Sequence, residues 1–156
     1  MPSVNLGIDR TLGPILQAYI LPTKYRIDAL IKAKLPVPAA ELGTFLLDTG
    51  ASQTCVDPLI ISKLGLTPTD FISIQTPSTN GVPAQCGTYD IGIIIGPTIA
   101  PSEVLNPILN MSYYCTLNVV EASLSHQGIS GLIGRDILEQ CILFYNGRVG
   151  GFTLSW

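Results

Sequence analysis

The residues of this chain best suited to chemistry are the Asp-Thr-Gly-Ala sequence at 48–51, which follows the apolar run Thr-Phe-Leu-Leu at 44–47. Such a run is typical of a buried strand, so it delivers the carboxylate of Asp48 into a turn of small residues. A carboxylate held there can activate water when a second carboxylate shares its proton. Because Asp-Thr-Gly occurs once, one chain would supply half a site, and a homodimer would complete it.

A second unit follows near the C-terminus, with the sequence Gly-Leu-Ile-Gly-Arg-Asp-Ile-Leu at 131–138. Its first four residues are typical of a short apolar strand that ends in a turn, and residues 135–140 predict a short helix. The helix would begin with Arg135 and Asp136, so a guanidinium and a carboxylate would lie close to that turn. Asp136 is expected to form structural hydrogen bonds.

The elements that must position these units are mostly strands. Twelve prolines and 15 glycines are spread along the chain, which favours many short strands joined by turns and an all-β class. Residues 45–47 predict a strand that leads into Asp48. Residues 26–35 alternate apolar and polar side chains and predict a half-buried strand. The first 24 residues show no clear period and are expected to be an N-terminal arm, an edge strand or a partly disordered segment.

One helix and one hairpin are predicted between the two units. Asp57 is a suitable N-cap, Pro58 a suitable first helical residue and Gly65 a suitable stop, so residues 59–64 should form a short helix. Strands are expected at residues 71–75 and 82–95. Between them, residues 76–81 end in Asn80-Gly81, a sequence that favours a hairpin reversal.

Taken in this order, the two units resemble the retropepsin family of aspartic proteases, the single-domain homodimeric relatives of retroviral proteases. The resemblance covers residues 25–156 as one protease domain, with residues 1–24 as the arm. It implies an all-β closed barrel with one or two short helices and a flap hairpin. It also implies an endopeptidase in which Asp48 of each chain is the catalytic residue, with no cofactor and no metal.

The resemblance assigns further roles residue by residue. Thr49 would hydrogen-bond across the dimer axis, Gly50 would present its carbonyl oxygen to the substrate, and Ala51 would complete the active-site turn. Gly134, Arg135 and Asp136 would brace that turn from behind, and the last strand, residues 152–156, would join an intermolecular sheet. The residues placed at the substrate would be Gly50, Ser52, Thr79, Asn80 and Gly81.

Two features depart from the family pattern. Ser52 stands where retroviral enzymes commonly have an acidic residue that pairs with the later arginine. Arg135 therefore needs another acceptor, and a backbone carbonyl, Asp136 and Asp57 are the alternatives. The hairpin carries Gly81 as its only glycine, together with prolines at 77 and 83, so its shape should differ from a glycine-rich flap.

Composition limits the other classes of function. The net charge of −3 and the lack of a basic stripe argue against a nucleic-acid partner. The longest apolar run, residues 91–100, is too short to span a bilayer, so no membrane partner is expected. The four cysteines and one histidine lack metal-ligand spacing. The N-terminus has no signal-peptide pattern, and we expect a cytoplasmic protein.

The main alternative is a catalytically inactive module of the same fold that binds peptides or mediates assembly. Such a module would use the same cleft to bind peptides or to assemble. The peptidase interpretation requires cleavage that depends on Asp48, whereas the module requires binding without cleavage. A hydrophobic content of 47% with only 12% charged residues indicates a chain that either buries an unusual fraction of its surface or covers apolar area with a partner, which suits an oligomer.

Overall fold

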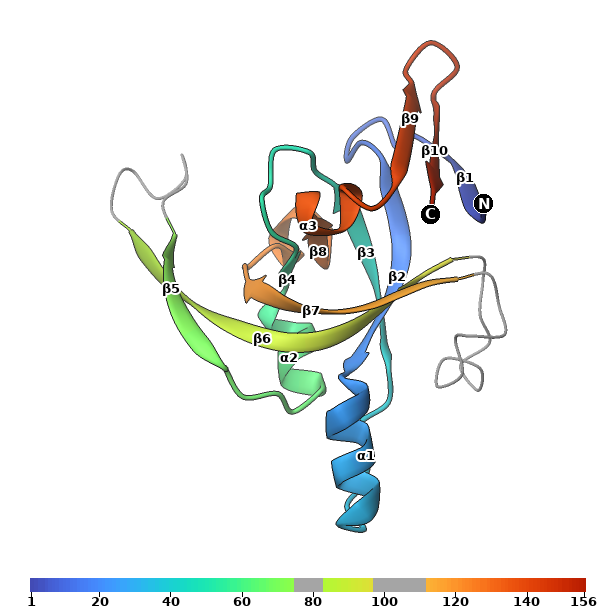
Figure 1. Ribbon diagram of the computed structural model, residues 1–156. Coiled ribbons are helices and arrows are strands. Elements are labelled where there is room, and N and C mark those ends of the chain that lie inside the picture. The colour runs from blue at the N-terminus through green and yellow to red at the C-terminus, as the bar shows by residue number, and fades with distance from the viewer. Residues whose placement is uncertain (75–82, 97–111) are drawn as a thin grey trace.

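The computed structural model of the chain describes residues 1–74, 83–96 and 112–156. Strands are the main regular elements among them, and they form a closed barrel and a smaller sheet that projects from one end of it (Figure 1). The prediction of an all-β closed barrel is confirmed. Both termini lie in the smaller sheet (Figure 1).

Six strands close the barrel. Their order around it is β2-β3-β8-β4-β7-β6, and pairing of β2 with β6 joins the ends. A seventh strand, β5, extends the sheet beyond β6. The bounds are β2 Ile15–Pro22, β3 Glu41–Leu47, β4 Cys55–Val56, β5 Asp70–Ile74, β6 Ala84–Ile95, β7 Tyr113–Glu121 and β8 Gly131–Ile133.

Alternating side chains fill the barrel. On β3, Phe45 and Leu47 point into the core and are buried, whereas Leu46 between them is only half-buried. The same period of two places Ile91, Ile93 and Ile95 of β6 in the core. The residue that follows Leu47 in this alternation, Asp48, therefore belongs to the face of β3 that points away from the core.

The smaller sheet has the order β1-β10-β9, with β1 at Ser3–Gly7, β9 at Ile142–Asn146 and β10 at Gly151–Ser155. β10 is antiparallel to both neighbours, and the two neighbours belong to the same chain. The prediction that the last strand joins an intermolecular sheet is therefore wrong for this arrangement, because both edges of β10 are already hydrogen-bonded.

The predicted strand at residues 26–35 is also wrong, since helix α1 occupies Lys24–Lys32. Thr23 caps it by accepting a hydrogen bond from the Arg26 N–H at 3.2 Å. The apparent alternation included alanines, which are favourable in an exposed helix, and the lysines and Leu30 are also strong helix formers. No residue of α1 is fully buried, so core packing did not impose the period of two.

The two other α-helices are short. Helix α2 spans Pro58–Lys63, and its prediction at residues 59–64 is confirmed, with Asp57 as the N-cap and Gly65 in the left-handed region. Helix α3 spans Arg135–Leu138, within the predicted residues 135–140. A 3-10 turn, η3, lies at Ser125–Gln127.

The strands on either side of the predicted hairpin turn are present. β5 and β6 are antiparallel and pair from Asp70 with Thr88 to Ile74 with Ala84. The predicted turn at residues 76–81, which includes Thr79, Asn80 and Gly81, lies outside the described residues.

Candidate active site

Asp48 lies directly after β3, where β3 is paired in parallel with β8. Leu47 lies opposite Ile133 of β8, and the Asp48 N–H continues that ladder by donating to the Ile133 carbonyl oxygen at 3.0 Å. The carboxylate is half-buried. The two sequence units, 85 positions apart at Asp48 and Ile133, therefore meet at this point of the barrel.

The turn after Asp48 is closed by its own hydrogen bonds. The Gly50 N–H donates to Asp48 Oδ1 at 2.8 Å, and the Ala51 N–H donates to the Asp48 carbonyl oxygen at 3.2 Å. A Cβ atom on Gly50 would lie 3.0 Å from Oδ1. A larger residue there would crowd the carboxylate, so the small side chains of the turn allow Asp48 to keep this orientation.

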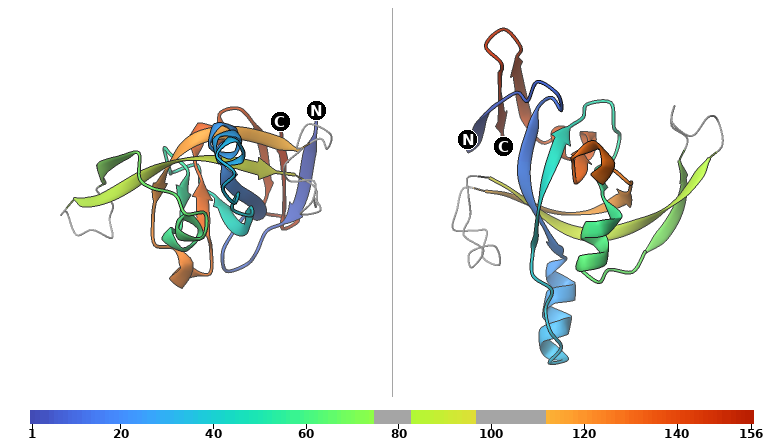
Figure 2. Two further views of the ribbon diagram at one scale, coloured as in Figure 1. Left: turned by 90° about the horizontal axis from the view of Figure 1, so that it is seen from below. Right: turned by 180° about the vertical axis from the view of Figure 1, so that it is seen from behind.

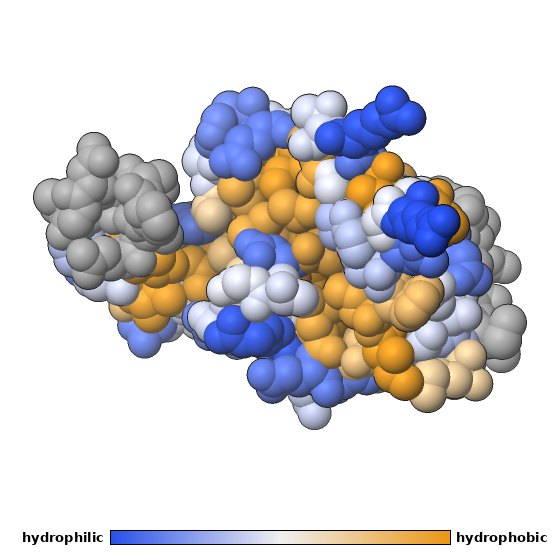
Figure 3. All heavy atoms as spheres, turned by 90° about the horizontal axis from the view of Figure 1, so that it is seen from above, coloured by the Kyte–Doolittle hydropathy of each residue, from blue (hydrophilic) through white to orange (hydrophobic). Residues whose placement is uncertain are grey.

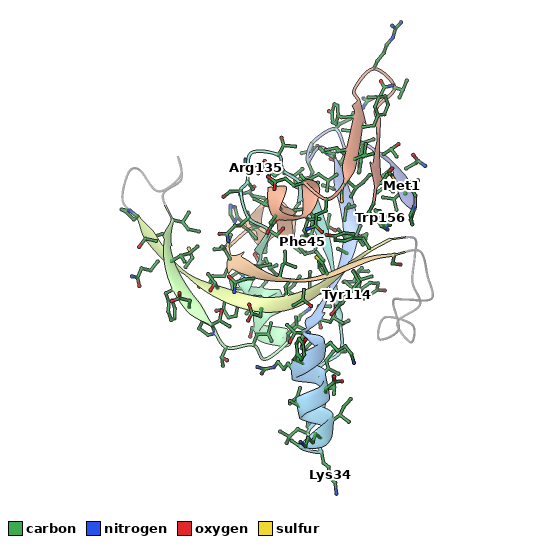
Figure 4. All side chains as sticks on the ribbon, in the orientation of Figure 1. Met1, Lys34, Phe45, Tyr114, Arg135 and Trp156 are labelled. Carbon is green, nitrogen blue, oxygen red and sulfur yellow. The ribbon has the colours of Figure 1, made fainter. Side chains whose placement is uncertain are left out.

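Arg135 holds the turn from the side of α3. Its Nη1 donates to the Thr49 carbonyl oxygen at 3.0 Å and, at a longer 3.4 Å, to that of Gly50. Its backbone N–H donates to the Ala51 carbonyl oxygen at 2.9 Å. Figure 4 shows Arg135 beside the loop that follows β3. Of the acceptors considered from the sequence, the backbone carbonyls are the ones that the guanidinium contacts.

Asp136 contacts Thr54, which lies between the turn and β4. Its Oδ2 accepts from the Thr54 N–H at 2.8 Å, and its Oδ1 accepts from the Thr54 hydroxyl at 2.7 Å. The same hydroxyl accepts from the Gly134 N–H at 3.1 Å. Thr54 is fully buried, so these polar groups satisfy one another where water has no access. Sequence reasoning missed Thr54.

Gly134 allows the two loops to approach closely. A Cβ atom there would lie 2.5 Å from the Gln53 carbonyl carbon and 2.8 Å from the Thr54 nitrogen. Both are backbone atoms, which cannot move aside as a side chain does. Any larger residue at 134 would push α3, and with it Arg135, away from the turn.

Asp57 lies apart from the site and caps helix α2. Its Oδ1 accepts from the Leu59 N–H at 2.9 Å, and its Oδ2 accepts from Leu124 and Ser125, each at 2.7 Å. Burial acts to raise the pKa of Asp57, but the hydrogen bonds from these N–H groups outweigh it and hold the pKa below its usual value. The predicted cap role is confirmed.

An apolar row lies on the same face of the barrel as Asp48. Leu46, Leu132 and Cys55 are neighbours in register on β3, β8 and β4, and all three are half-buried. Burial, followed by the nearby carboxylates and the thiol of Cys86, raises the pKa of Cys55 to about 11, so its thiol is neutral near pH 7. The alternation of buried and half-buried residues on β3 is the sequence signal that could have identified this row.

The remaining predicted site residues are either exposed or outside the described residues. Ser52 and Thr49 are exposed beside the turn, whereas Thr79, Asn80 and Gly81 lie outside the described residues. Within residues 1–74, 83–96 and 112–156, no group of three His, Cys, Asp or Glu side chains is placed to hold a metal ion. No helix in these ranges is long and apolar enough to cross a membrane.

Comparison with known proteins supports the fold. No family model matches the sequence, and no curated protein matches it either. Among solved structures, a retropepsin-like aspartic protease from Rickettsia conorii is similar, with a TM-score of 0.56 and 14% sequence identity. The match covers 99% of this chain and 90% of that chain. At this identity the likeness establishes the fold alone, and the fold of this chain is retropepsin-like.

Proposed function

We propose that the chain is an aspartic endopeptidase of the retropepsin type, which acts as a homodimer with Asp48 of each protomer as the catalytic residue. The observation that carries this proposal is the fixed turn. Asp48 Oδ1 is held by the Gly50 N–H, while Arg135 holds the Thr49 and Gly50 carbonyls. Fixing a carboxylate in place before the substrate arrives favours a reaction over simple structural capping.

The reaction needs two such carboxylates. When two are in contact, both cannot be ionised at little cost, so the pair holds one proton. The ionised carboxylate removes a proton from water, and that water attacks the peptide carbonyl carbon. The protonated carboxylate donates to the carbonyl oxygen, which gives a neutral tetrahedral intermediate. Transfer of a proton to the amide nitrogen then releases the amine product and the new carboxylic acid.

The substrate in this proposal is an extended peptide between the turn and the β5–β6 pair. Its backbone would form strand-like hydrogen bonds, and its apolar side chains would pack against Leu46, Leu132 and Cys55. These three residues give a row without charge. We therefore expect cleavage beside apolar residues in preference to charged ones.

The second protomer would dock at the end of the molecule that carries the smaller sheet. Apolar side chains form a broad band across this end (Figure 3). On β9, Ile142 and Phe144 are 58% and 61% exposed, and they alternate with Leu143, which faces the core. Because β10 is paired on both sides, this exposed side of β9 is a more suitable contact than β10.

The test is cleavage of an unbiased peptide library by the purified protein, analysed by mass spectrometry. We expect Asp48→Asn to abolish cleavage, whereas Asp28→Asn, which changes an exposed carboxylate on α1, leaves it unchanged. A transition-state analogue with a statine hydroxyl should inhibit the wild-type protein. Undiminished cleavage by the Asp48→Asn variant would refute the assignment, and peptide binding without cleavage by the wild-type protein would favour the inactive module.

Sedimentation velocity at micromolar concentration tests the dimer. We expect Ile142→Ser/Phe144→Ser to shift the protein towards the monomer and to lower the peptidase activity with it. Leu59→Ser is the matched control, because Leu59 is equally exposed (63%) but lies on α2. A monomeric wild-type protein that still cleaves peptides would contradict the shared site.

A further inference from the structure

Helix α1 is an element of this fold that the proposed peptidase site does not use. It lies between β2 and β3 and projects from the end of the barrel opposite the β9–β10 hairpin (Figure 1). The rear view in Figure 2 also shows it standing away from the barrel. Ile27 contacts a small cluster around Leu21 and Ile94, and Arg26 Nη2 donates to the Gly65 carbonyl oxygen at 2.9 Å, whereas no residue of α1 is fully buried. Most of the helix therefore remains available to a partner.

The outer end of this helix is both apolar and cationic. We call Ile31, Lys32, Lys34 and Leu35 the α1 tip; Ile31 and Leu35 are 61% and 56% exposed. Four of the eight lysines and arginines of the chain lie between residues 24 and 34, together with one acid, Asp28. This segment has a formal charge of +3, whereas the rest of the chain carries −6. Lys32 and Lys34 form no ion pair with any described residue.

Lys34 has a backbone conformation that is unfavourable for a lysine. Helices α1 and α2 end in the same motif, in which two N–H groups beyond the cap donate back to the last turn. The bonds are Lys34 to Ile31 and Leu35 to Leu30 in α1, and Gly65 to Ser62 and Leu66 to Ile61 in α2. The motif requires a left-handed residue. Gly65 fills that position in α2 with φ 59°, whereas in α1 Lys34 adopts φ 56°.

A residue with a side chain is less stable than glycine in the left-handed region, so Lys34 lowers the free energy of unfolding relative to a glycine at this position. Such outliers often accompany function. Here the strained residue carries a cation at the outer end of α1, as Figure 4 shows. It is also flanked by two exposed apolar side chains. Strain, charge and apolar exposure therefore coincide at four residues.

From these observations we propose that the α1 tip docks on an anionic lipid surface. The two ammonium groups would contact headgroup phosphates and carboxylates, and Ile31 and Leu35 would enter the boundary of the acyl chains. A lipid surface fits better than an acidic protein because the tip is convex. Headgroups can rearrange around a protruding end, whereas a protein partner would need a matching hollow. The prediction of no membrane partner rested on the lack of a spanning run, and a peripheral contact needs none.

The proposal is independent of the peptidase site. The turn after β3 lies toward the hairpin end of the barrel, away from α1 (Figure 1). A molecule docked by the α1 tip would therefore keep Asp48 open to solvent. Asp48→Asn should bind lipid as the wild type does, so failure of one proposal leaves the other intact.

The experiment is co-sedimentation of the full chain with vesicles of phosphatidylcholine containing 30% phosphatidylserine, at about 0.1 M salt. We expect the partition coefficient to fall about five-fold for each lysine neutralised, hence about 25-fold for Lys32→Gln/Lys34→Gln. Arg148→Gln is the matched control, because Arg148 lies in the turn between β9 and β10 at the other end of the molecule. It should change binding by less than about two-fold.

Two further variants separate docking from a structural role. Ile31→Ser/Leu35→Ser should lower binding equally at low and high salt, because it removes the apolar contribution. Lys34→Gly should lower binding about five-fold while the protein becomes more resistant to urea. Equal binding to pure phosphatidylcholine, an equal loss in Arg148→Gln, or no vesicle binding with retention on polyglutamate would each overturn the proposal.

Discussion

Replacing Thr54 with valine should destabilise the protein far more than the change in shape suggests. Valine has nearly the volume of threonine, so the core around position 54 stays filled. The hydroxyl, however, donates to Asp136 Oδ1 at 2.7 Å and accepts from the Gly134 N–H at 3.1 Å. Valine removes both bonds at a position that is fully buried.

The magnitude follows from those two losses. A hydrogen bond to a charged group contributes about 1.5–3 kcal/mol, and a buried N–H left without a partner costs about 1–3 kcal/mol. We therefore expect the free energy of unfolding to fall by about 3–5 kcal/mol, allowing for partial relaxation. Thr54→Ser keeps the hydroxyl and loses one methyl group, so it should cost only about 1 kcal/mol.

The assay is urea unfolding followed by the fluorescence of Trp156, the only tryptophan of the chain. Its ring packs edge-on against Tyr113 at a centroid distance of 6.2 Å, so unfolding should change its emission. Both variants are measured at one protein concentration, because the proposed dimer would make stability depend on concentration. If the valine variant were within about 1 kcal/mol of the serine variant, the network would not have the role that its geometry implies.

Three other changes test separate parts of the structure. Asp57→Asn should lower the free energy of unfolding near neutral pH. Because the pKa of Asp57 is held below its usual value, the difference from the wild-type protein should shrink as the pH falls below about 4. A difference in urea unfolding that does not depend on pH would contradict this prediction. Cys55, whose pKa is raised to about 11, should be alkylated at pH 8 far more slowly than a free thiol, as measured by mass spectrometry of its peptide; equal rates would show that the thiol is not shielded. Lys34→Gly should raise the free energy of unfolding by about 1 kcal/mol in urea, since it relieves the left-handed strain; a loss of stability would mean that the lysine has a favourable contact.

Local sequence signals correctly predicted those elements whose local preference for helix or strand is the same as the structure they adopt in the fold. At α2, the cap Asp57, the proline at the first helical position and the stop at Gly65 each act within a few residues, and all three lie where the sequence placed them. β3 was predictable for the same reason, because its apolar residues fill the barrel. At α1, by contrast, alternating alanines and isoleucines imitated a strand, and only the absence of a neighbouring strand could have shown the error.

The candidate site was predictable in its residues but not in its contacts. Asp48 and Arg135 could be identified from two short motifs, whereas the acceptors of Arg135 depend on how closely α3 approaches the turn. That approach is set by Gly134, which contacts backbone atoms of Gln53 and Thr54. The role of Thr54 depends on the same packing. These residues can be read from a single sequence, but the distances between them depend on tertiary packing.

The smaller sheet limits how a second protomer could dock in the proposed homodimer. β1 covers one edge of β10, and the Trp156 N–H continues that pairing by donating to the Pro2 carbonyl oxygen at 3.1 Å. β9 covers the other edge. A partner could add to β10 only by displacing β1, which would break the five paired residues of that strand before any new bond formed. Docking on the exposed side of β9 breaks none of them. It also leaves β3 and β8 untouched, so the turn that holds Asp48 would be the same in the monomer and in the dimer.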